Sequence, residues 1–344
     1  MPHASAAPQP DPRPHTVVLL QYAGIGDLIW HIPYFKAVAA QSREGRITLV
    51  AQPSTLARQF LGEEPWIEHI IDHDHRPRRT EKRKGKHAGL AGMWRMAQEL
   101  RAGRFDRIVL FSGRPSRGLI AALSGIPQRL GFGYNRLQRL FLNQPPYIEH
   151  YRGPSLQFYP EASAFAVAHG FCAEALVPRI EPPAAWVERL TARLAHLPRP
   201  LYAFAIGSSE TYKQWGAKNY ADLATRLSRE GAGVLLLGGP GERQLTRDIL
   251  SLIPPPEAGN VLEVTDVPAL GSAAALSVVD ICVGNDTGMV NVAAAVERPT
   301  YVIIGPRPTL DHDPLMHMVK AAKLSDISVD RVFGLLQDAR PKQS

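Results

Sequence analysis

Hydrophobic residues in the first part of the chain fall into short, nearly continuous runs, and helical spacing follows several of them. The runs are TVVLLQ (16–21), ITLVA (47–51), IEHII (67–71) and DRIVLF (106–111). Runs of this kind, without strict alternation, are typical of strands buried on both faces of a parallel sheet. Helical spacing follows the first run and recurs near 90–102 and 115–124. The pattern predicts a doubly wound α/β unit.

The second part of the chain repeats this pattern. Its apolar runs are LYAFAI (201–206), GVLLLGG (233–239), DICVG (280–284) and TYVIIG (300–305), and its predicted helices lie near 217–229, 242–252, 267–277 and 288–296. This half is therefore predicted to form a second doubly wound unit, with two such domains facing a central cleft lined by loops at the carboxyl ends of the strands.

Three segments stand outside the repeat. A proline- and aromatic-rich stretch, roughly 144–160, breaks the rhythm, and a helix at 186–197 leads into the second set of strands. The segment 330–340 is predicted to be a final helix that packs across the domains.

Composition agrees with a folded protein of two domains. The chain has 344 residues, 45% of them hydrophobic and 21% charged, and no apolar run approaches the ~20 residues of a membrane-spanning helix. Residues 1–15 are proline-rich and lack the apolar centre of a secretory signal, so we expect a disordered lead. Only Cys172 and Cys282 are present, far apart, which favours a reducing, cytoplasmic compartment.

The charge balance indicates an anionic partner. The net charge is +7, and part of the excess lies in RPRRTEKRKGKH, residues 76–87. Such a patch fits a phospholipid, a phosphorylated glycan or a nucleic acid, or else a solvated loop. We expect no nucleic-acid binding, because no RNA module or interleaved aromatic residues accompany the charges. His73 and His75 nearby suggest a metal site, but exposed histidines on a basic loop are the favoured interpretation.

The turn after the first predicted strand, in LLQYAGIGDLIWHIP, holds a carboxylate. Gly24 and Gly26 match a dinucleotide-binding turn, but Ile29 replaces its third glycine and Asp27 stands where a phosphate would lie. One interpretation is that Asp27 caps the helix or complements its dipole. The other is that the turn projects Asp27 into the cleft for chemistry.

Three loops of the second half carry groups suited to a nucleotide diphosphate. Ser208, Ser209 and Lys213 follow one strand and offer hydroxyls and an ammonium, although a solvated loop with an N-capping serine would have the same composition. In GNDTGMVNVAAA (284–295) a helix begins at once after the strand, so its amino end would face an anion.

The acidic residues of these loops have two interpretations each. Asp286 either caps the following helix or accepts hydrogen bonds from sugar or ribose hydroxyls. Glu242, in GGPGE (238–242), either binds ribose or complements a helix dipole. The three loops follow successive strands of one predicted domain, and this favours convergence on one ligand. No Asp-x-Asp pair lies in these three loops, so the sequence predicts no metal site there, and Lys213 would supply positive charge to the diphosphate.

These motifs together resemble glycosyltransferase family 9, the ADP-heptose:lipopolysaccharide heptosyltransferases. The resemblance rests on GDLIWHIP around Asp27, on Lys-x-Trp at Lys213 and Trp215, on LLLGGPGE, and on DTGxxNxAAA from Asp286, in the family's order and spacing. It covers roughly residues 16–320 and includes the segment 112–132. The combination is specific, although no single motif is.

The resemblance implies a GT-B fold and an inverting transfer that uses an ADP-sugar and needs no metal or other cofactor. It implies an acceptor-binding domain at 16–180, a nucleotide-sugar-binding domain at 181–325, and a C-terminal helix and tail at 326–344. Asp27 would be the general base and Lys213 would stabilise departing ADP. The donor-binding residues would be Ser208, Ser209, Lys213, Glu242, Asp286, Thr287, Gly288 and Asn291.

The implied acceptor is an anionic lipid-linked glycan at the inner face of the membrane. Its binding residues would be Gly26, Arg114, Arg117 and Arg136, with Arg139 extending the same basic surface. The basic segment 76–86 is a candidate for peripheral membrane contact.

Two positions depart from the family's pattern. Asn291 stands where members commonly have histidine, and Arg307 where a small hydroxylated residue usually follows Gly-Pro. Both belong to the expected sugar end of the donor site, so a different nucleotide-sugar donor stays open. A sugar-nucleotide epimerase and a non-catalytic glycan- or nucleotide-binding protein stay open as well, although Asp27, Lys213 and Asp286 argue against a non-catalytic protein.

Overall fold

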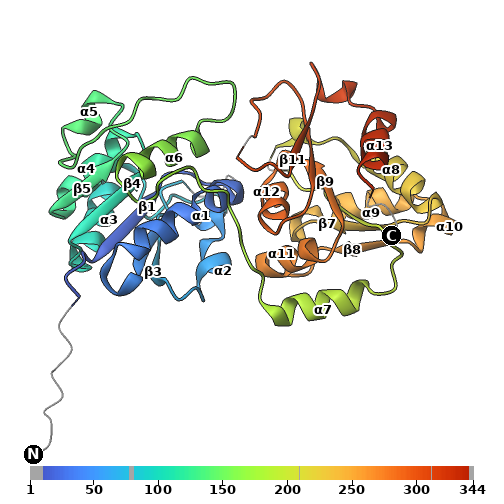
Figure 1. Ribbon diagram of the computed structural model, residues 1–344, viewed down its shortest axis with the longest axis horizontal. Coiled ribbons are helices and arrows are strands. Elements are labelled where there is room, and N and C mark those ends of the chain that lie inside the picture. The colour runs from blue at the N-terminus through green and yellow to red at the C-terminus, as the bar shows by residue number, and fades with distance from the viewer. Residues whose placement is uncertain (1–10, 77–80, 209, 311, 341–344) are drawn as a thin grey trace, which may run out of the picture. The chain divides into compact units, whose positions relative to one another are not determined.

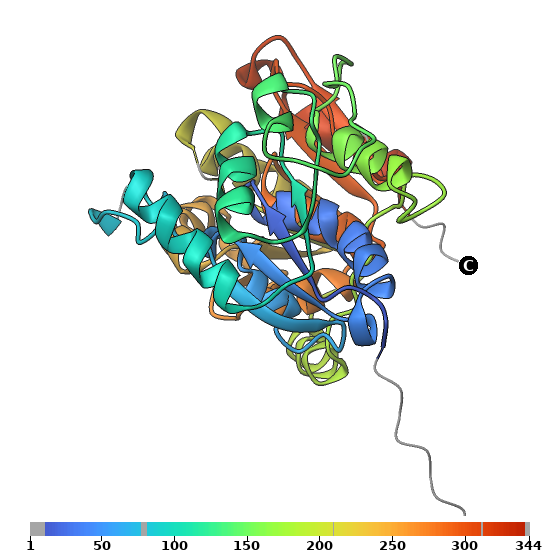
Figure 2. The same ribbon diagram turned by 90° about the vertical axis from the view of Figure 1, so that its left-hand side faces the viewer.

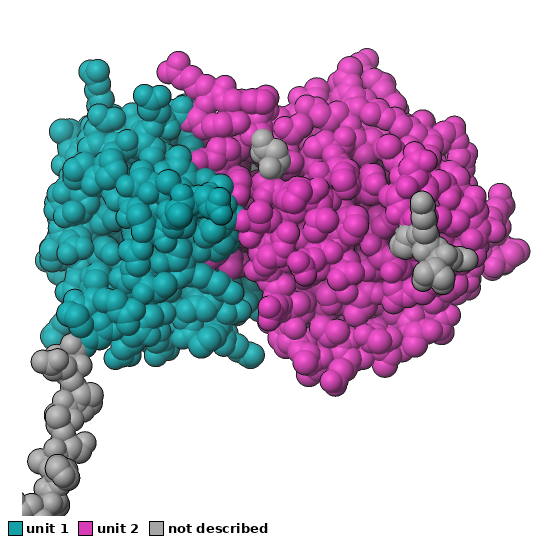
Figure 3. All heavy atoms as spheres, viewed as in Figure 1, with its two compact units in different colours: residues 1–23, 33–150, 161–176 teal, residues 24–32, 151–160, 177–344 magenta. Residues whose placement is uncertain are grey.

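A computed structural model describes residues 11–76, 81–208, 210–310 and 312–340. The chain divides into two compact units, each with its own parallel sheet (Figures 1 and 3). The first unit comprises residues up to 23, 33–150 and 161–176, and the second comprises 24–32, 151–160 and 177–344. The segment that carries Asp27 is thus grouped with the second unit.

The sheet of the first unit has the order β3-β2-β1-β4-β5, with all strands parallel. The strands are β1 (Thr16–Leu20), β2 (Ile47–Ala51), β3 (Ile67–Asp72), β4 (Arg107–Phe111) and β5 (Gln128–Gly131). The three inner strands β1, β2 and β4 are buried along their whole length, as their continuous apolar runs predict.

Helices cover both faces of this sheet (Figure 2). They are α1 (Ile25–Ala40), α2 (Ala57–Leu61), α3 (Gly89–Ala102), α4 (Pro115–Ser124), α5 (Arg136–Arg139) and α6 (Phe158–Ala168). On one face, α3 and α4 contribute Met96 and Ile120 to a core with Ile108. On the other face, the ring of Phe111 lies 5.4 Å from that of Phe35 in α1 and 5.3 Å from that of Phe165 in α6.

The sheet of the second unit has the order β11-β10-β9-β6-β7-β8, again entirely parallel. Its strands are β6 (Leu201–Ala205), β7 (Gly233–Leu237), β8 (Val261–Val264), β9 (Ile281–Asn285), β10 (Thr300–Ile304) and β11 (Met316–Lys320). Counted from β6, this is the strand order 3-2-1-4-5-6 of dinucleotide-binding folds. Both units are therefore Rossmann-like, and the predicted fold class is confirmed.

The helices of the second unit also lie on both faces of its sheet. They are α7 (Ala184–Leu194), α8 (Ala217–Arg229), α9 (Arg243–Leu252), α10 (Pro255–Ala258), α11 (Ala269–Ser277), α12 (Gly288–Ala295) and α13 (Val329–Asp338). Helices α8, α9 and α13 share one core with Phe204 and Val283. Helix α12 packs against β9 and β10, and α7 packs against α11.

The structure adds elements that the sequence pattern misses. Strands β5, β8 and β11 lie at sheet edges and are only partly buried, so they lack the continuous apolar runs of inner strands. Helix α6 begins inside the proline-rich stretch. The sequence predicts the helix at 330–340 to pack across the domains; in the structure this helix, α13, packs on α8 within the second unit, where Val332 and Leu336 enter the core.

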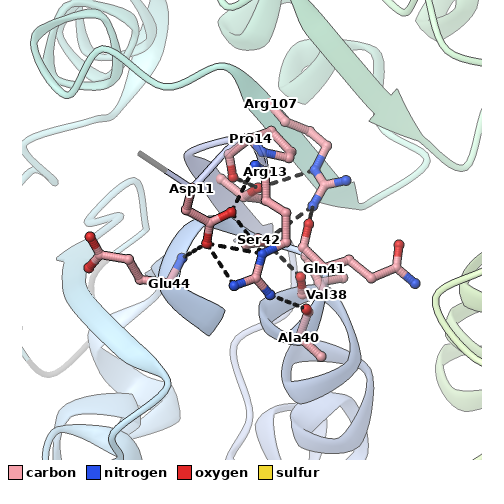
Figure 4. A network of polar contacts seen from close by, with 10 residues as sticks. Asp11, Arg13, Pro14, Val38, Ala40, Gln41, Ser42, Glu44 and Arg107 are labelled. Carbon is pink, nitrogen blue, oxygen red and sulfur yellow. Dashed lines mark hydrogen bonds and ion pairs between the residues drawn. The ribbon is translucent and has the colours of Figure 1, made fainter. Parts of the chain in front are cut away.

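Polar contacts anchor the start of the described chain to the first unit (Figure 4). Arg13 donates a hydrogen bond to the carbonyl of Ala40 (2.8 Å) and forms an ion pair with Asp11 (2.7 Å). These residues belong to the predicted disordered lead, so its described part is fixed. Arg107 donates to the Gln41 carbonyl (3.0 Å), and burial lowers the pKa of its guanidinium to about 10. Among the described residues, no helix has both the length and the apolar character that crossing a membrane requires.

Candidate functional site

The candidate site of the second unit begins where β6 and β9 lie side by side. At this point the strand order reverses, and ligands of such sheets bind outside the carboxyl ends of the strands. Asn285, buried at the end of β9, accepts a hydrogen bond from the Trp215 amide (3.0 Å) and donates to the Ile206 carbonyl (3.0 Å). Asn285 therefore ties together two of the predicted loops. None of the sequence motifs assigns it a role, although a buried amide ending an apolar strand is a usable signal.

The β6 loop holds Lys213 beside its own acidic neighbour. Lys213 ends a 3₁₀ turn, η4 (Thr211–Lys213), and its Nζ lies 3.1 Å from the carboxylate of Glu210. Ser208 donates its hydroxyl to the Glu210 carbonyl (2.7 Å). The Lys213 side chain is 14% exposed, so its charge is partly shielded from water. Ser209 lies outside the described residues.

Glu242 lies close to the same loop. It ends the 3₁₀ turn η5 (Pro240–Glu242), and its Oε2 accepts the Gly239 amide hydrogen (2.8 Å). A Cβ built on Gly207 would stand 3.5 Å from the Glu242 carboxyl carbon. The structure thus brings the β7 turn and the β6 loop together, and Glu242 also caps its own turn.

The amino end of α12 combines a cap residue, an ion pair and a small pocket. Thr287 is the N-cap, but its side chain makes no capping bond, and its buried Oγ1 has no hydrogen-bond partner among the described residues. Asp286 forms an ion pair with Arg307. Lys213, Asp286 and Arg307 line a pocket of about 160 Å³ with Tyr212 and Gly305. This combination suits an anionic ligand, because Lys213 and Arg307 line one pocket and α12 begins two residues after Asp286, which lines the same pocket.

The turn with Asp27 packs against this helix end. A Cβ on Gly26 would stand 2.7 Å from Nδ2 of Asn291, and a Cβ on Gly288 would stand 2.6 Å from Cβ of Ile25. Only glycine at both positions permits so close an approach of the amino ends of α1 and α12. Asp27 is half-buried in the first turn of α1.

Two predicted ligand residues make protein contacts as well. The Asp27 carboxylate accepts the Gly24 amide hydrogen (2.7 Å), so the helix-capping interpretation of Asp27 is realised in the structure. The Asn291 amide is buried and bonds to Trp30 and to the carbonyl of Thr287. Gly26 is buried against that amide.

The predicted acceptor arginines lie in the first unit and differ in exposure. Arg114, the N-cap of α4, and Arg136, in α5, are exposed. Arg117 is predicted to extend a basic surface, but it is buried, with 4% of its surface exposed. Its Nη2 lies 3.0 Å from Nε2 of His75. Arg117 has no carboxylate partner within ion-pair distance among the described residues, and its Nε has no hydrogen-bond partner there.

The prediction that His73 is exposed is wrong. His73 continues the edge of β3, where its amide donates to the Ala51 carbonyl (2.8 Å), and it is only 1% exposed. Its ring stacks on that of His75, with 4.6 Å between centroids. Burial, together with the charge of Arg117, lowers the pKa of His73 to about 2 and that of His75 to about 4. Both imidazoles are therefore neutral near pH 7.

Within the described ranges, no three histidine, cysteine or acidic residues are arranged to hold a metal ion.

The charge of the basic segment 76–86 is partly neutralised by ion pairs. Arg83 pairs with Asp74 (2.5 Å) and Lys86 with Glu99 (2.5 Å), whereas residues 77–80 lie outside the described residues.

Comparison with known proteins gives similarities of two kinds. The model of glycosyltransferase family 9 (heptosyltransferase) matches residues 93–329. Lipopolysaccharide heptosyltransferase 2 of Salmonella typhimurium is 30% identical over 128 residues, and this matched segment covers 37% of this chain and 37% of that relative.

Solved structures extend the similarity to nearly the whole chain. Escherichia coli ADP-heptose LPS heptosyltransferase II has a TM-score of 0.72 at 19% identity, covering 94% of this chain and 98% of the other. Escherichia coli heptosyltransferase WaaC, solved with ADP-2-deoxy-2-fluoro heptose, has a TM-score of 0.68 at 18% identity, covering 94% and 99%. At this identity the likeness establishes the shared fold.

Proposed function

Since this chain belongs to glycosyltransferase family 9 (heptosyltransferase), we propose that it transfers a heptose or a related sugar from ADP-heptose to a hydroxyl of an anionic surface glycan such as a lipopolysaccharide core. The observation that carries the proposal is the packing of the Asp27 turn against the amino end of α12. It brings a candidate base and a candidate anion-binding helix end into one unit of the structure.

In this proposal the second unit binds the donor. Lys213, the serines at 208 and 209 and the amino end of α12 contact the diphosphate, since it offers dense negative charge and many acceptor oxygens. Glu242 binds ribose hydroxyls, while Asp286, Thr287 and Gly288 contact the sugar and phosphates. The unsatisfied Oγ1 of Thr287 supports this assignment, because a buried hydroxyl without a partner is costly.

Transfer would proceed with inversion and without a metal. Asp27 accepts the proton of the acceptor hydroxyl, whose oxygen forms a bond to the anomeric carbon. The bond between that carbon and the β-phosphate oxygen breaks, and ADP leaves with the electron pair. The Gly24 amide holds the Asp27 carboxylate in place, and Lys213 balances the charge that develops on ADP.

The first unit would bind the acceptor through its anionic groups. Arg117 supports this role because a buried guanidinium without a carboxylate partner is electrostatically uncompensated. An acceptor phosphate or carboxylate would supply the missing charge, and the exposed Arg114 and Arg136 would contact the remaining anionic groups. Peripheral membrane contact through residues 76–86 belongs to the same proposal.

One observation favours a second candidate, transfer from a different nucleotide sugar. Arg307 forms an ion pair with the carboxylate of Asp286 in the pocket that Lys213 also lines. Asp286 is therefore available to sugar hydroxyls only if the pair opens or Arg307 shares the ligand. A donor sugar with an additional anionic group would suit this arrangement as well as a neutral heptose.

Calorimetric titration with ADP, GDP and UDP, each with and without EDTA, tests the donor assignment. Selective ADP binding that persists in EDTA is the expected result, and preference for GDP or UDP would support the second candidate. Incubation with ADP-heptose and deep-truncated lipopolysaccharide then tests transfer. Release of ADP only when acceptor is present supports a transferase, whereas an isomerised donor without acceptor would indicate an epimerase instead.

A further inference from the structure

A buried amide joins the helix that carries Asp27 to the helix that begins at Gly288. Asn291 lies in α12 with 3% of its surface exposed. Its Oδ1 accepts the indole hydrogen of Trp30 (2.7 Å), and its Nδ2 donates to the carbonyl of Thr287 (2.9 Å). Both polar atoms of the side chain are therefore engaged by protein groups, although the sequence predicts Asn291 as a donor ligand.

The partner indole is fixed by its own surroundings. Trp30 is 4% exposed, and its ring lies 5.8 Å from that of Phe158 in a stacked arrangement and 5.1 Å from that of His312 edge-on. Rings packed at these distances restrict the indole, so its N–H direction is set. Because its donor and its acceptor are both fixed, this hydrogen bond constrains the relative orientation of Trp30 and Asn291.

The bond acts one helical turn from the candidate base. Trp30 follows Asp27 by three positions in α1, which places the two side chains as neighbours on the helix surface. Thr287, the other partner of Asn291, is the N-cap of α12. A single amide thus links the turn that holds the candidate base to the cap residue of the candidate donor helix.

Apolar packing alone would hold these helices together less specifically. Ile25 against Gly288 and Gly26 against Asn291 already bring the backbones close, but such contacts tolerate small sliding movements. A buried hydrogen bond fixes the register, because any slide leaves two buried polar groups unsatisfied. Displacement of a reacting group by 1 Å costs about 100-fold in rate, so this register would matter for transfer.

We propose that Trp30 and Asn291 are positioning residues: their hydrogen bond holds Asp27 in register with the amino end of α12, and Asn291 makes no contact with the donor. The inference rests on the proposed function, in which Asp27 is the base. The proposal also explains why an asparagine stands at position 291, since a planar amide bonds to the indole and to the backbone of its own helix at once.

The first experiment measures the hydrogen bond itself. Trp30→Phe identifies the Trp30 indole signal among those of five tryptophans in a ¹⁵N-correlated NMR spectrum, and its exchange with deuterium is then followed in the unmodified protein. We expect slow exchange, becoming at least 10-fold faster in Asn291→Leu. Exchange as fast as that of an exposed indole would overturn the proposal, whatever the enzyme catalyses.

The second experiment measures what the bond does. We expect Trp30→Phe and Asn291→Leu each to lower kcat for transfer by about 10- to 100-fold, with ADP affinity within about threefold of the unmodified protein. In an Asp27→Asn background, Trp30→Phe should cause no further loss, because it acts through Asp27. Unfolding midpoints of all variants separate this from simple destabilisation.

Three results would contradict the positioning role. ADP affinity lowered at least 10-fold by Asn291→Leu with kcat retained would make Asn291 a donor ligand. Losses from Trp30→Phe that multiply with those of Asp27→Asn would give the bond a role independent of the base. Full transfer by Trp30→Phe would remove it from the reaction. Absence of transfer by the unmodified protein would count against the proposed function, while the exchange experiment would still test the hydrogen bond.

Discussion

The Asp27 carboxylate has a structural role in the turn before α1, and the proposed reaction gives it a catalytic role as well. It accepts the Gly24 amide hydrogen at the start of α1, and the proposed reaction requires it to accept a proton from the acceptor. The first task is met by any side-chain carbonyl oxygen, whereas the second requires a carboxylate. The two roles can therefore be separated by an isosteric substitution.

Asp27→Asn should keep the cap and lose the base. We expect transfer to fall by about 10²- to 10⁴-fold, the usual contribution of a general base, with ADP affinity and thermal stability nearly unchanged. Steady-state kinetics and ADP titration measure both quantities. Asp72→Asn, a half-exposed carboxylate that pairs with Arg58, is the matched control and should retain full activity. Full turnover by Asp27→Asn would exclude Asp27 as the base.

The Asp286–Arg307 pair makes a second prediction about single residues. Asp286 is only 12% exposed, so Arg307→Ser would leave a shielded carboxylate beside the proposed diphosphate site. We expect ADP affinity to fall about 10-fold, since a like charge then faces the phosphates. Asp286→Asn in the Arg307→Ser background should restore most of that loss. If the double variant binds ADP no better than Arg307→Ser, repulsion by Asp286 is not the cause, and Arg307 acts as a direct ligand instead.

At the scale of elements, the inner strands are predictable from sequence, whereas of the edge strands β3 is predicted by its apolar run and β5, β8 and β11 are not. Runs such as 201–206 are buried on both faces, so the apolar pattern alone identifies β6. β8 and β11 at the edges have exposed positions that interrupt the pattern. The loops of the candidate site could be predicted because they follow inner strands.

The partners of the site residues could not be predicted in the same way. Trp30 and Asn291 are 261 positions apart, and Asp286 and Arg307 are 21 apart; neither separation follows a local periodicity. The burial of His73 also depends on tertiary packing. It could not be predicted from sequence, because the basic residues after His73 suggest an exposed loop.

The contact between the amino ends of α1 and α12 is testable through its glycines. A Cβ on Gly288 would stand 2.6 Å from Cβ of Ile25, whereas a Cβ on Gly334 in α13 would meet nothing within 4 Å. We expect Gly288→Ala to destabilise by about 1–3 kcal/mol through overpacking and to reduce transfer at least 10-fold. Gly334→Ala should be neutral or stabilising by up to about 1 kcal/mol. Urea unfolding and transfer rates measure both; equal behaviour of the two variants would mean that the helix contact is loose.

At the scale of the whole molecule, buried neutral histidines tie stability to pH. Burial lowers the pKa of His31 to about 4, and burial with the nearby Arg179 charge lowers that of His312 to about 3. With His73 at about 2, these groups remain neutral in the folded protein at pH 5, while the unfolded chain takes up protons below about pH 6.5. Because the unfolded state binds more protons, the contribution of these histidines to the free energy of unfolding is present above pH 6.5 and is lost progressively as the pH falls from there.

His73→Phe should remove one part of this acid sensitivity. Phenylalanine fills a similar volume beside the ring of His75 and does not titrate, so the unfolded chain gains one proton fewer on acidification. For a group with a pKa near 2 folded and 6.5 unfolded, the loss of unfolding free energy between pH 7 and pH 5 is about 2 kcal/mol. Urea unfolding at pH 7 and pH 5 measures this difference. Between the two pH values, we expect the unfolding free energy of the variant to fall by about 2 kcal/mol less than that of the unmodified protein. His196→Gln, at an exposed position, is the matched control and should leave the pH difference unchanged. An unchanged difference in His73→Phe would mean that His73 takes up a proton in the folded protein, which its contact with the Arg117 and His75 cluster opposes.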